Sequence, residues 1–268
     1  MATASHDPAH TDHSADTLRG RYDAVKERIA RAARRSGRAP EDIILVAVTK
    51  YASIDQVRQL IEFGQVDLGE SRVQQLVQRA AQIDEYIERQ RLVRGRGAAC
   101  EGVRWHMIGH LQRNKARKVL PRIRLVHSLD SLRLAEEIQI AGAKLPEPVE
   151  VLVQINVQGD KGKYGVAPAA VRHLVDQIDT MMNIRPRGLM CMAPPVEDPE
   201  DSRPVFSMCR EIFDDVRRSG SGGEQFDVLS MGMTSDYEVA IECGANIVRV
   251  GSAIFGERAE TDDEDDGE

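Results

Sequence analysis

Short apolar stretches rich in β-branched residues alternate with helical stretches along most of this chain. Eight apolar stretches of this kind occur, at residues 43–49, 66–68, 104–109, 125–129, 149–157, 185–192, 227–232 and 246–255. Almost continuous apolar runs are typical of strands that are buried on both faces. Each of the first seven is followed by a predicted helix. One more helix is predicted before the first strand, at 17–37, from apolar residues spaced three and four positions apart.

Eight strands that are joined through helices predict a closed barrel. Because right-handed crossovers make successive strands parallel, the expected fold class is α/β, a single (β/α)8 TIM barrel. The extra N-terminal helix is available to cover the eighth strand. An open, doubly wound sheet is the alternative, but it normally has fewer strands and a glycine-rich first turn. Neither GxGxxG nor GxxxxGK[ST] occurs in the sequence.

The predicted barrel domain occupies residues 17–258. Residues 1–16 and 259–268 are expected to be disordered tails, and residues 89–102 an irregular surface insertion after a long helix at about 70–90. The C-terminal tail carries seven of the 43 acidic residues, which accounts for the net charge of −7 and leaves the rest balanced. Balanced charge indicates no nucleic-acid footprint, and no apolar run approaches the roughly 20 residues of a membrane span.

Neither a disulfide framework nor a zinc site is expected, because the four cysteines show no CxxC pairing or even spacing. Three histidines, His6, His10 and His13, lie in the predicted N-terminal tail, where disorder is favoured over metal binding. The same tail lacks the apolar core of a secretory signal and the arginine-rich character of a transit peptide, which favours a cytoplasmic location. No sizeable exposed apolar stripe is evident, so a monomer is expected.

Polar residues at the ends of predicted strands are the candidates for a functional site, because active sites of TIM barrels form where the carboxyl ends of the strands meet. Lys50 ends the first strand, and Ser230 lies near the end of the seventh. Arg249, Gly251 and Ser252 lie near the end of the eighth. A closed barrel brings strands one, seven and eight side by side. We therefore expect these five residues to share one site.

The loop at 230–236, after the seventh strand, indicates a phosphorylated ligand. It is short and rich in hydroxyls, and it opens a helix, whose first N–H groups and dipole favour a phosphate. Gly251 and Ser252 add a position where backbone N–H groups can approach a ligand closely and a further hydroxyl. The alternative is that Thr234 or Ser235 only caps the helix, since both residue types are preferred there.

Lys50 and Arg249 indicate imine chemistry at the same site. A lysine at the end of a buried strand costs free energy unless its amine or its charge is used. Burial and a neighbouring Arg249 would both favour the neutral amine, which is the form that attacks an aldehyde. Strand alternation between Val248 and Val250 turns Arg249 towards a polar mouth. The alternatives are that Lys50 pairs with a carboxylate or extends to solvent, and that Arg249 forms a structural ion pair.

Seven segments of the sequence resemble those of the pyridoxal phosphate homeostasis proteins, which in turn resemble the N-terminal barrel of alanine racemase. They run in collinear order from about residue 17 to 258, which makes a chance resemblance negligible. The segments are AVTKYAS (47–53), GESRVQQ (69–75), WHMIGHLQRNK (105–115), INVQGDKGKYG (155–165), GLMCMAP (188–194), LSMGMTSDYEVAIECG (229–244) and VRVGSAIFGER (248–258).

The resemblance implies a barrel of PLP fold-type III in which Lys50 holds pyridoxal 5'-phosphate (PLP) as a Schiff base. It implies that Arg249 faces the pyridine nitrogen of the cofactor and that Ser230, Gly251 and Ser252 serve its phosphate. It also implies a role in intracellular vitamin B6 homeostasis, in which the protein holds PLP and releases it to PLP-dependent apoenzymes without catalytic turnover.

Two further positions matter in the resemblance. Lys163, within DKGKYG, matches a second lysine of the family that assists cofactor transfer. Ser71 stands where the family pattern usually has asparagine, so an amide contact from that position is not carried over.

A PLP-dependent amino-acid racemase or lyase on the same barrel is the alternative function. Racemases of this barrel carry an added β domain that brings an opposing tyrosine to the site, whereas the residues after Arg258 are mostly acidic. A two-base mechanism therefore lacks an evident second base, although Tyr164 could substitute. The expectation is a PLP carrier rather than an enzyme.

Overall fold

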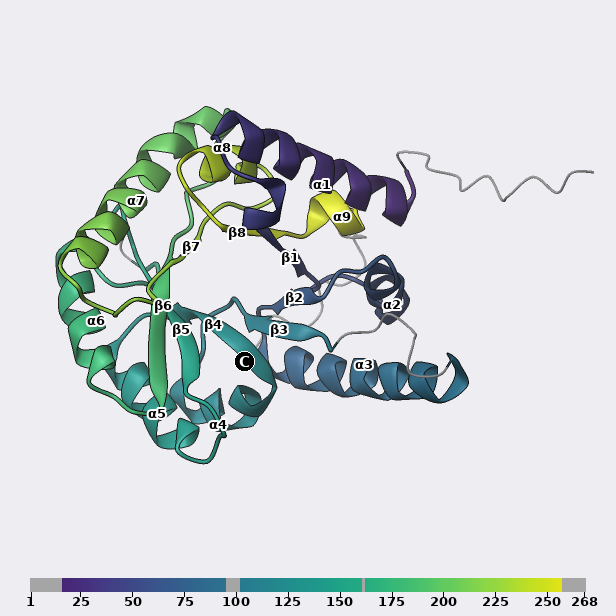
Figure 1. Ribbon diagram of the computed structural model, residues 1–268, viewed down its shortest axis with the longest axis horizontal. Coiled ribbons are helices and arrows are strands. Elements are labelled where there is room, and N and C mark those ends of the chain that lie inside the picture. The colour runs from purple at the N-terminus through teal and green to yellow at the C-terminus, as the bar shows by residue number, and fades with distance from the viewer. Residues whose placement is uncertain (1–15, 95–101, 161, 257–268) are drawn as a thin grey trace, which may run out of the picture.

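The computed structural model describes residues 16–94, 102–160 and 162–256, which fold into a closed barrel of eight parallel strands (Figure 1). The strands pair in chain order, and β8 returns to pair with β1. The (β/α)8 barrel predicted from the sequence is confirmed. The strands are β1 Ile44–Val48, β2 Asp67–Glu70, β3 Arg104–Met107, β4 Ile123–Leu129, β5 Val149–Gln154, β6 Ile184–Met190, β7 Val228–Ser230 and β8 Ile247–Val250.

Helices surround the ring of strands (Figure 1). The extra helix α1, Leu18–Arg35, begins after Thr17, whose hydroxyl accepts a hydrogen bond from the N–H of Gly20, and it packs against α8 and α9. The other helices are α2 Ile54–Glu62, α3 Val73–Arg94, α4 Ala116–Val119, α5 Leu132–Gly142, α6 Val171–Asp179, α7 Arg203–Arg218, α8 Tyr237–Glu242 and α9 Ser252–Phe255. Short 3-10 turns are η1 Pro40–Asp42, η2 Arg113–Lys115, η3 Leu120–Arg122, η4 Pro168–Ala170 and η5 Pro199–Ser202.

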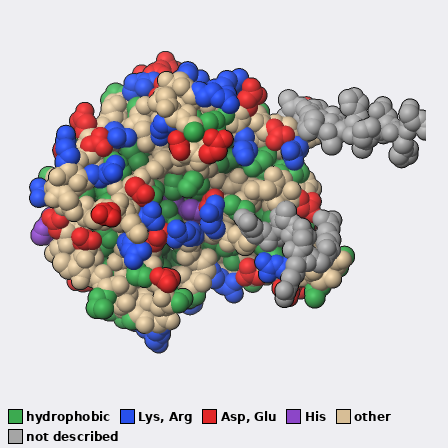
Figure 2. Space-filling model, viewed as in Figure 1, with side chains coloured by type: hydrophobic (Ala, Val, Ile, Leu, Met, Phe, Trp, Pro, Cys, Tyr) green, Lys and Arg blue, Asp and Glu red, His purple; other side chains and the backbone are tan. Residues whose placement is uncertain are grey.

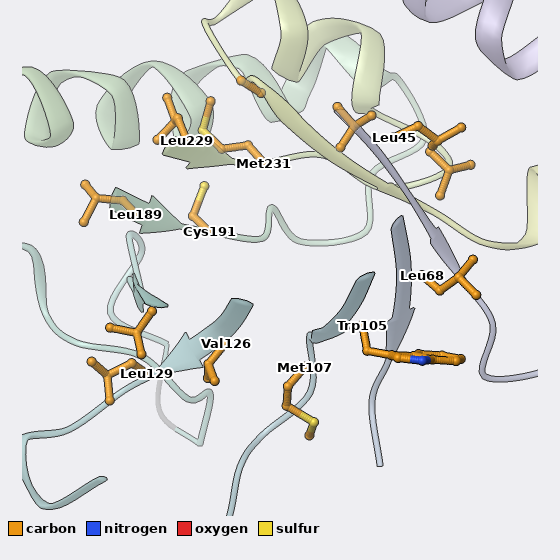
Figure 3. Close-up of a cluster of buried hydrophobic side chains, with 14 of the residues drawn as sticks. Leu45, Leu68, Trp105, Met107, Val126, Leu129, Leu189, Cys191, Leu229 and Met231 are labelled. Carbon is orange, nitrogen blue, oxygen red and sulfur yellow. The ribbon is translucent and has the colours of Figure 1, made fainter. Parts of the chain in front are cut away.

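The core has two layers because successive side chains of a strand point to opposite faces. The larger layer lies between the strands and the helices, and part of it, including Leu45, Leu68 and Trp105, is seen around the ring in Figure 3. The smaller layer fills the barrel with Val46, Leu125, Leu152, Met190 and Ile247. Polar side chains, among them His106, His127 and Arg249, share the barrel interior with this second layer.

Strands β3, β5, β6 and β7 end two or three residues earlier than predicted, and two other predicted boundaries were wrong by more. Residues 89–94 of the predicted insertion belong to helix α3, because RQRLVR consists of residues compatible with a helix and the first helix breaker is Gly95. The eighth strand ends at Val250 rather than running to residue 255, because Gly251 starts a turn into α9. Residues 95–101 of the insertion, and the predicted tails apart from Asp16, lie outside the described residues.

The face of the molecule shown in Figure 2 carries interspersed acidic and basic side chains. This mixture matches the balanced charge of the sequence outside its acidic end. No helix within the described residues has the length and apolar character that crossing a bilayer requires.

Gly188 in β6 is the glycine on which closure of the barrel depends most directly. Its φ angle is +150°, and an added Cβ would lie 1.7 Å from the carbonyl oxygen of Val228 on the neighbouring strand β7. We expect Gly188→Ala to lower the free energy of unfolding by about 3 kcal/mol or more, because the two strands would have to separate. Urea unfolding followed by circular dichroism measures this loss. Gly102→Ala is the control, since no atom of the described residues lies within 4 Å of its Cβ position; equal stability of the two variants would contradict the prediction.

Candidate functional site

A cavity of about 670 Å³ opens where the carboxyl ends of the strands meet. This volume is within the usual range of small-molecule sites. Four of the five residues predicted from the sequence line it, and Ser230 does not. The lining residues are Val48, Lys50, Tyr51, Ala52, Ser71, Ile108, Gly109, His110, Gln154, Tyr164, Met192, Met233, Thr234, Ser235, Arg249, Gly251, Ser252, Phe255 and Gly256.

Lys50 lies two residues beyond the end of β1, where the chain leaves the barrel. Its side chain is exposed, and its Nζ lies 4.7 Å from the centre of the Tyr51 ring. The expectation that burial desolvates this amine was therefore wrong, because the last buried residue of the run is Thr49. Lys50 reaches the cavity from its rim, in contact with solvent.

A buried carboxylate holds the backbone just before Lys50. Glu70, at the end of β2, is fully buried, accepts a hydrogen bond from the hydroxyl of Thr49 (2.6 Å) and forms an ion pair with Nε of Arg79 (3.0 Å). Burial raises the pKa of Glu70, and the contacts with Thr49 and Arg79 oppose this shift. The amide of Thr49 also donates to the carbonyl of Gly69 (2.9 Å). These contacts fix the point from which the lysine extends.

Arg249 points into the barrel from β8, while its neighbours Val248 and Val250 belong to the layer under the helices. The inward orientation predicted from strand alternation is thus confirmed. Arg249 is only 4% exposed, and its guanidinium donates to the hydroxyl of Ser230 (2.6 Å) and to the carbonyl oxygen of Cys191 (3.0 Å). Burial lowers the pKa of Arg249 from its usual value, but a guanidinium remains charged in proteins. The base of the cavity therefore contains a fixed positive charge.

Hydroxyls from two neighbouring loops meet at one wall of the cavity. Thr234, in the loop between β7 and α8, accepts from the N–H of Gly251 (3.4 Å) and from the hydroxyl of Ser252 (3.3 Å). Ser235 lines the same wall. The residue before α8 is Asp236, so neither Thr234 nor Ser235 is the cap that the alternative interpretation required. Both residues line the cavity instead.

Ser230 lies below the cavity rather than in its wall. Its side chain is fully buried, and its hydroxyl contacts Arg249 and Nδ1 of His127 (3.0 Å). The structure therefore brings Ser230 to Arg249 and not to the hydroxyl-rich wall. The loop that the sequence singled out reaches the cavity through Met233, Thr234 and Ser235 instead.

The opposite wall contains residues that sequence reasoning did not assign to ligand binding. The rings of His110 and Tyr164 stack with 3.8 Å between their centres and 13° between their planes. Gln154, at the end of β5, donates to the carbonyl of Tyr164 (3.1 Å). The signal that could have found Gln154 and His110 is their position, since each closes or follows an apolar strand. Tyr164, considered earlier as a second base, is 56% exposed at this rim.

Lys163 lines an adjoining cavity of about 310 Å³, which shares Gln154, Tyr164, Met192 and Met233 with the main one. Its Nζ forms an ion pair with Asp160 (2.5 Å). This lysine is therefore a neighbour of the main cavity and not part of its lining.

An amine, a buried guanidinium and a hydroxyl-rich wall at the mouth of a (β/α)8 barrel place this chain in the class of the alanine racemase N-terminal domain, whose family model matches residues 21–259. A protein of Aquifex aeolicus (strain VF5) named pyridoxal phosphate homeostasis protein is 35% identical over 242 residues, which are 89% of this chain and 97% of that protein. The protein of the same name from Escherichia coli (strain K12) is 34% identical over 87% of this chain and 94% of its own length. The chain belongs to the pyridoxal phosphate homeostasis protein family.

Solved structures agree with this assignment. PipY of Synechococcus elongatus PCC7942, determined with PLP bound, is 28% identical with a TM-score of 0.71 over 85% of this chain and all of its own. A protein of unknown role from Bifidobacterium adolescentis is 36% identical with a TM-score of 0.80, covering 93% of this chain and 98% of that one. The alanine racemase of Corynebacterium glutamicum, at 14% identity and a TM-score of 0.61, shares the fold alone.

Proposed function

We propose that this protein binds PLP in the main cavity, holds it covalently on Lys50 and releases it again as part of intracellular vitamin B6 homeostasis. The observation that carries the proposal is the meeting of three groups in one cavity: the amine of Lys50, the guanidinium of Arg249, and the hydroxyls beside Gly251. An amine, a fixed cation and an anion-binding wall are the groups that an aldehyde-bearing pyridine phosphate requires.

Lys50 is proposed to provide the covalent attachment. When bound, PLP supplies an aldehyde that condenses with an unprotonated primary amine, with loss of water. Lys50 carries the only primary amine among the described residues that line the cavity. Its position at the exposed rim favours exchange of the cofactor with solvent, which is what a carrier needs and what a permanently buried attachment would hinder.

The phosphate is proposed to bind at the wall formed by Thr234, Ser235, Gly251 and Ser252. Three of these residues offer hydroxyls, and Gly251 lets the backbone approach the ligand closely. Ser230, which the sequence also predicted for this role, is proposed to act indirectly, because its hydroxyl is bound to Arg249.

Arg249 is proposed to face the pyridine nitrogen of the cofactor. A guanidinium can only donate hydrogen bonds, so it stabilises the unprotonated ring nitrogen. An unprotonated pyridine is a weaker electron sink than a pyridinium. This property suits holding the cofactor better than using it for turnover, in accordance with the names of the relatives. We further propose that the protein acts as a cytoplasmic monomer and passes PLP to apoenzymes.

The phosphate wall gives the test of this function. Titration of the purified protein, followed by absorbance, is expected to show binding of PLP at least about a hundredfold tighter than that of pyridoxal, because two or three charge-assisted hydrogen bonds are lost without the phosphate. Ser252→Ala is expected to weaken PLP severalfold and to leave pyridoxal binding unchanged. Equal affinities for PLP and pyridoxal in the unaltered protein, or no absorbance change with PLP, would contradict the proposal.

A further inference from the structure

A row of buried polar side chains crosses the interior of the barrel from β8 to β2. Each member comes from a different strand, and none is more than 6% exposed. Burying polar groups costs free energy unless each finds a partner. The members are Arg249, Ser230, His127, His106 and Asp67.

Every neighbouring pair in the row is within hydrogen-bonding distance. Starting from the cavity, the distances are 2.6 Å from NH1 of Arg249 to Oγ of Ser230, 3.0 Å from Oγ to Nδ1 of His127, 2.9 Å from Nε2 of His127 to Nδ1 of His106, and 2.9 Å from Nε2 of His106 to Oδ1 of Asp67. The second oxygen of Asp67 pairs with Arg104 (2.6 Å), whose side chain is about half exposed. The row thus reaches from the cavity to the opposite end of the barrel.

The two ends of the row determine the direction of its hydrogen bonds. Arg249 can only donate, so Oγ of Ser230 accepts from it, and the single hydroxyl proton of Ser230 is directed to Nδ1 of His127. An ionised carboxylate can only accept, so His106 donates from Nε2 to Asp67. With both imidazoles neutral, each has one proton, and Nε2 of His127 is then the donor to Nδ1 of His106. All four hydrogen bonds therefore point away from Arg249 and towards Asp67.

The charges of the groups agree with this direction. Burial alone would raise the pKa of Asp67, but the hydrogen bonds from His106 and Arg104 outweigh it and lower the pKa, so the carboxylate is ionised at neutral pH. Burial lowers the pKa of His127 well below its usual value, and the charge of Arg249 adds to this shift, so His127 is neutral. The row has a cation at one end, an anion at the other and the neutral His127 between them.

We propose that Asp67, His106, His127 and Ser230 are positioning residues that hold the guanidinium of Arg249 in one orientation at the cavity, with Asp67 as its remote counter-charge. The NH1 group is fixed by Ser230, and NH2 is fixed by the carbonyl of Cys191. Each hydrogen bond in such a row polarises the next one. The carboxylate of Asp67 therefore makes the hydroxyl oxygen of Ser230 a stronger acceptor for Arg249. The effect of this row on PLP rests on the function proposed above, whereas its direction can be tested without PLP.

Nitrogen NMR of the ligand-free protein, with labelled histidine and arginine, tests the direction. His106 and His127 are both expected to be neutral with the proton on Nε2. Asp67→Asn is expected to shift the Nδ1 signal of His127 and the Nε signal of Arg249, although the substitution is two and four hydrogen bonds of the row away from them. A charged His106, or a proton on Nδ1 of His127, would overturn the proposal. So would an Nε signal of Arg249 whose chemical shift is the same in Asp67→Asn as in the unaltered protein.

Binding of PLP tests the consequence. Ser230→Ala and Asp67→Asn are each expected to weaken PLP about tenfold. The matched controls are Ser128→Ala, which removes an equally buried hydroxyl that has no partner among the described residues, and Arg104→Gln, which removes the ion pair but leaves the row intact. Both controls are expected to change the affinity less than twofold. If Ser230→Ala binds PLP as tightly as Ser128→Ala does, the positioning role is wrong even when Lys50 still carries the cofactor. If Asp67→Asn fails to fold, the affinity of Ser230→Ala for PLP decides this experiment alone.

Discussion

Lys50→Ala is expected to abolish the covalent attachment of PLP completely. Lys50 has the only primary amine among the described residues that line the cavity, so its removal leaves the cofactor with no attachment point there. Borohydride reduction of the PLP-loaded protein, followed by peptide mass spectrometry, measures the attachment. In the unaltered protein, the label is expected on the peptide that contains Lys50, and in the variant no labelled peptide is expected.

The fold should be unaffected by this change. Because Lys50 is exposed, the free energy of unfolding is expected to change by about 0.5 kcal/mol or less. Lys50→Arg keeps the positive charge and should abolish the label equally, which separates the amine from the charge. Lys163→Ala is the matched control from the adjoining cavity, and its label should remain on Lys50. Label on any other lysine of the unaltered protein would contradict the proposed attachment.

The barrel could be predicted because two features of the sequence indicate its strands. The strands are apolar runs, and they alternate regularly with helices. The boundaries that were predicted wrongly lie where the local sequence is compatible with more than one structure and no pattern of apolar residues decides between them. Residues 89–94 extend α3 because nothing in their sequence stops a helix, and residues 252–255 form α9 although AIF resembles the end of a strand. Apolar residues suit both structures, and only the turn at Gly251 separates them.

The candidate site was predictable to the extent that it depends on strand ends. Lys50, Arg249, Gly251 and Ser252 meet in one cavity because parallel strands place their carboxyl ends on one side. The sequence does not show how far along the barrel axis each of these side chains lies. Ser230 is the last residue of β7 and remains inside the barrel, whereas Lys50 lies two residues past the end of β1 and reaches solvent.

The buried row of polar residues has a signal in the sequence, in the strands β3 and β4. His106 and His127 each interrupt an apolar strand, in RWHM and LVHSL, at an inward-facing position. A single histidine in a strand is uninformative, since many are satisfied locally. Two of them on adjacent strands gain meaning only when the pairing is known, and β3 and β4 pair with a register shift between Trp105 and His106. The contact between the two rings therefore could not be derived from the spacing.

Arg249→Gln is expected to change both the affinity for PLP and the absorption of the bound cofactor. The substitution keeps hydrogen-bond donors but removes the buried charge that faces the proposed position of the pyridine nitrogen. Loss of hydrogen bonds from a charged group, about 1.5–3 kcal/mol, corresponds to a loss of affinity of roughly tenfold to a hundredfold. The ring nitrogen can then accept a proton, so the absorption spectrum should become pH-dependent near neutral pH, whereas that of the unaltered protein should not.

Arg249→Lys separates charge from geometry in this experiment. A lysine at this position keeps the positive charge but cannot reproduce the paired contacts to Ser230 and to the carbonyl of Cys191. Its affinity for PLP should fall as in the glutamine variant, while its spectrum should stay independent of pH, because protonation of the ring is still opposed by a neighbouring cation. Arg249→Glu would combine both losses with an anion buried against the Cys191 carbonyl, and so is expected to unfold the barrel rather than report on the cofactor. Identical spectra for the glutamine variant and the unaltered protein across this pH range would place Arg249 away from the pyridine nitrogen.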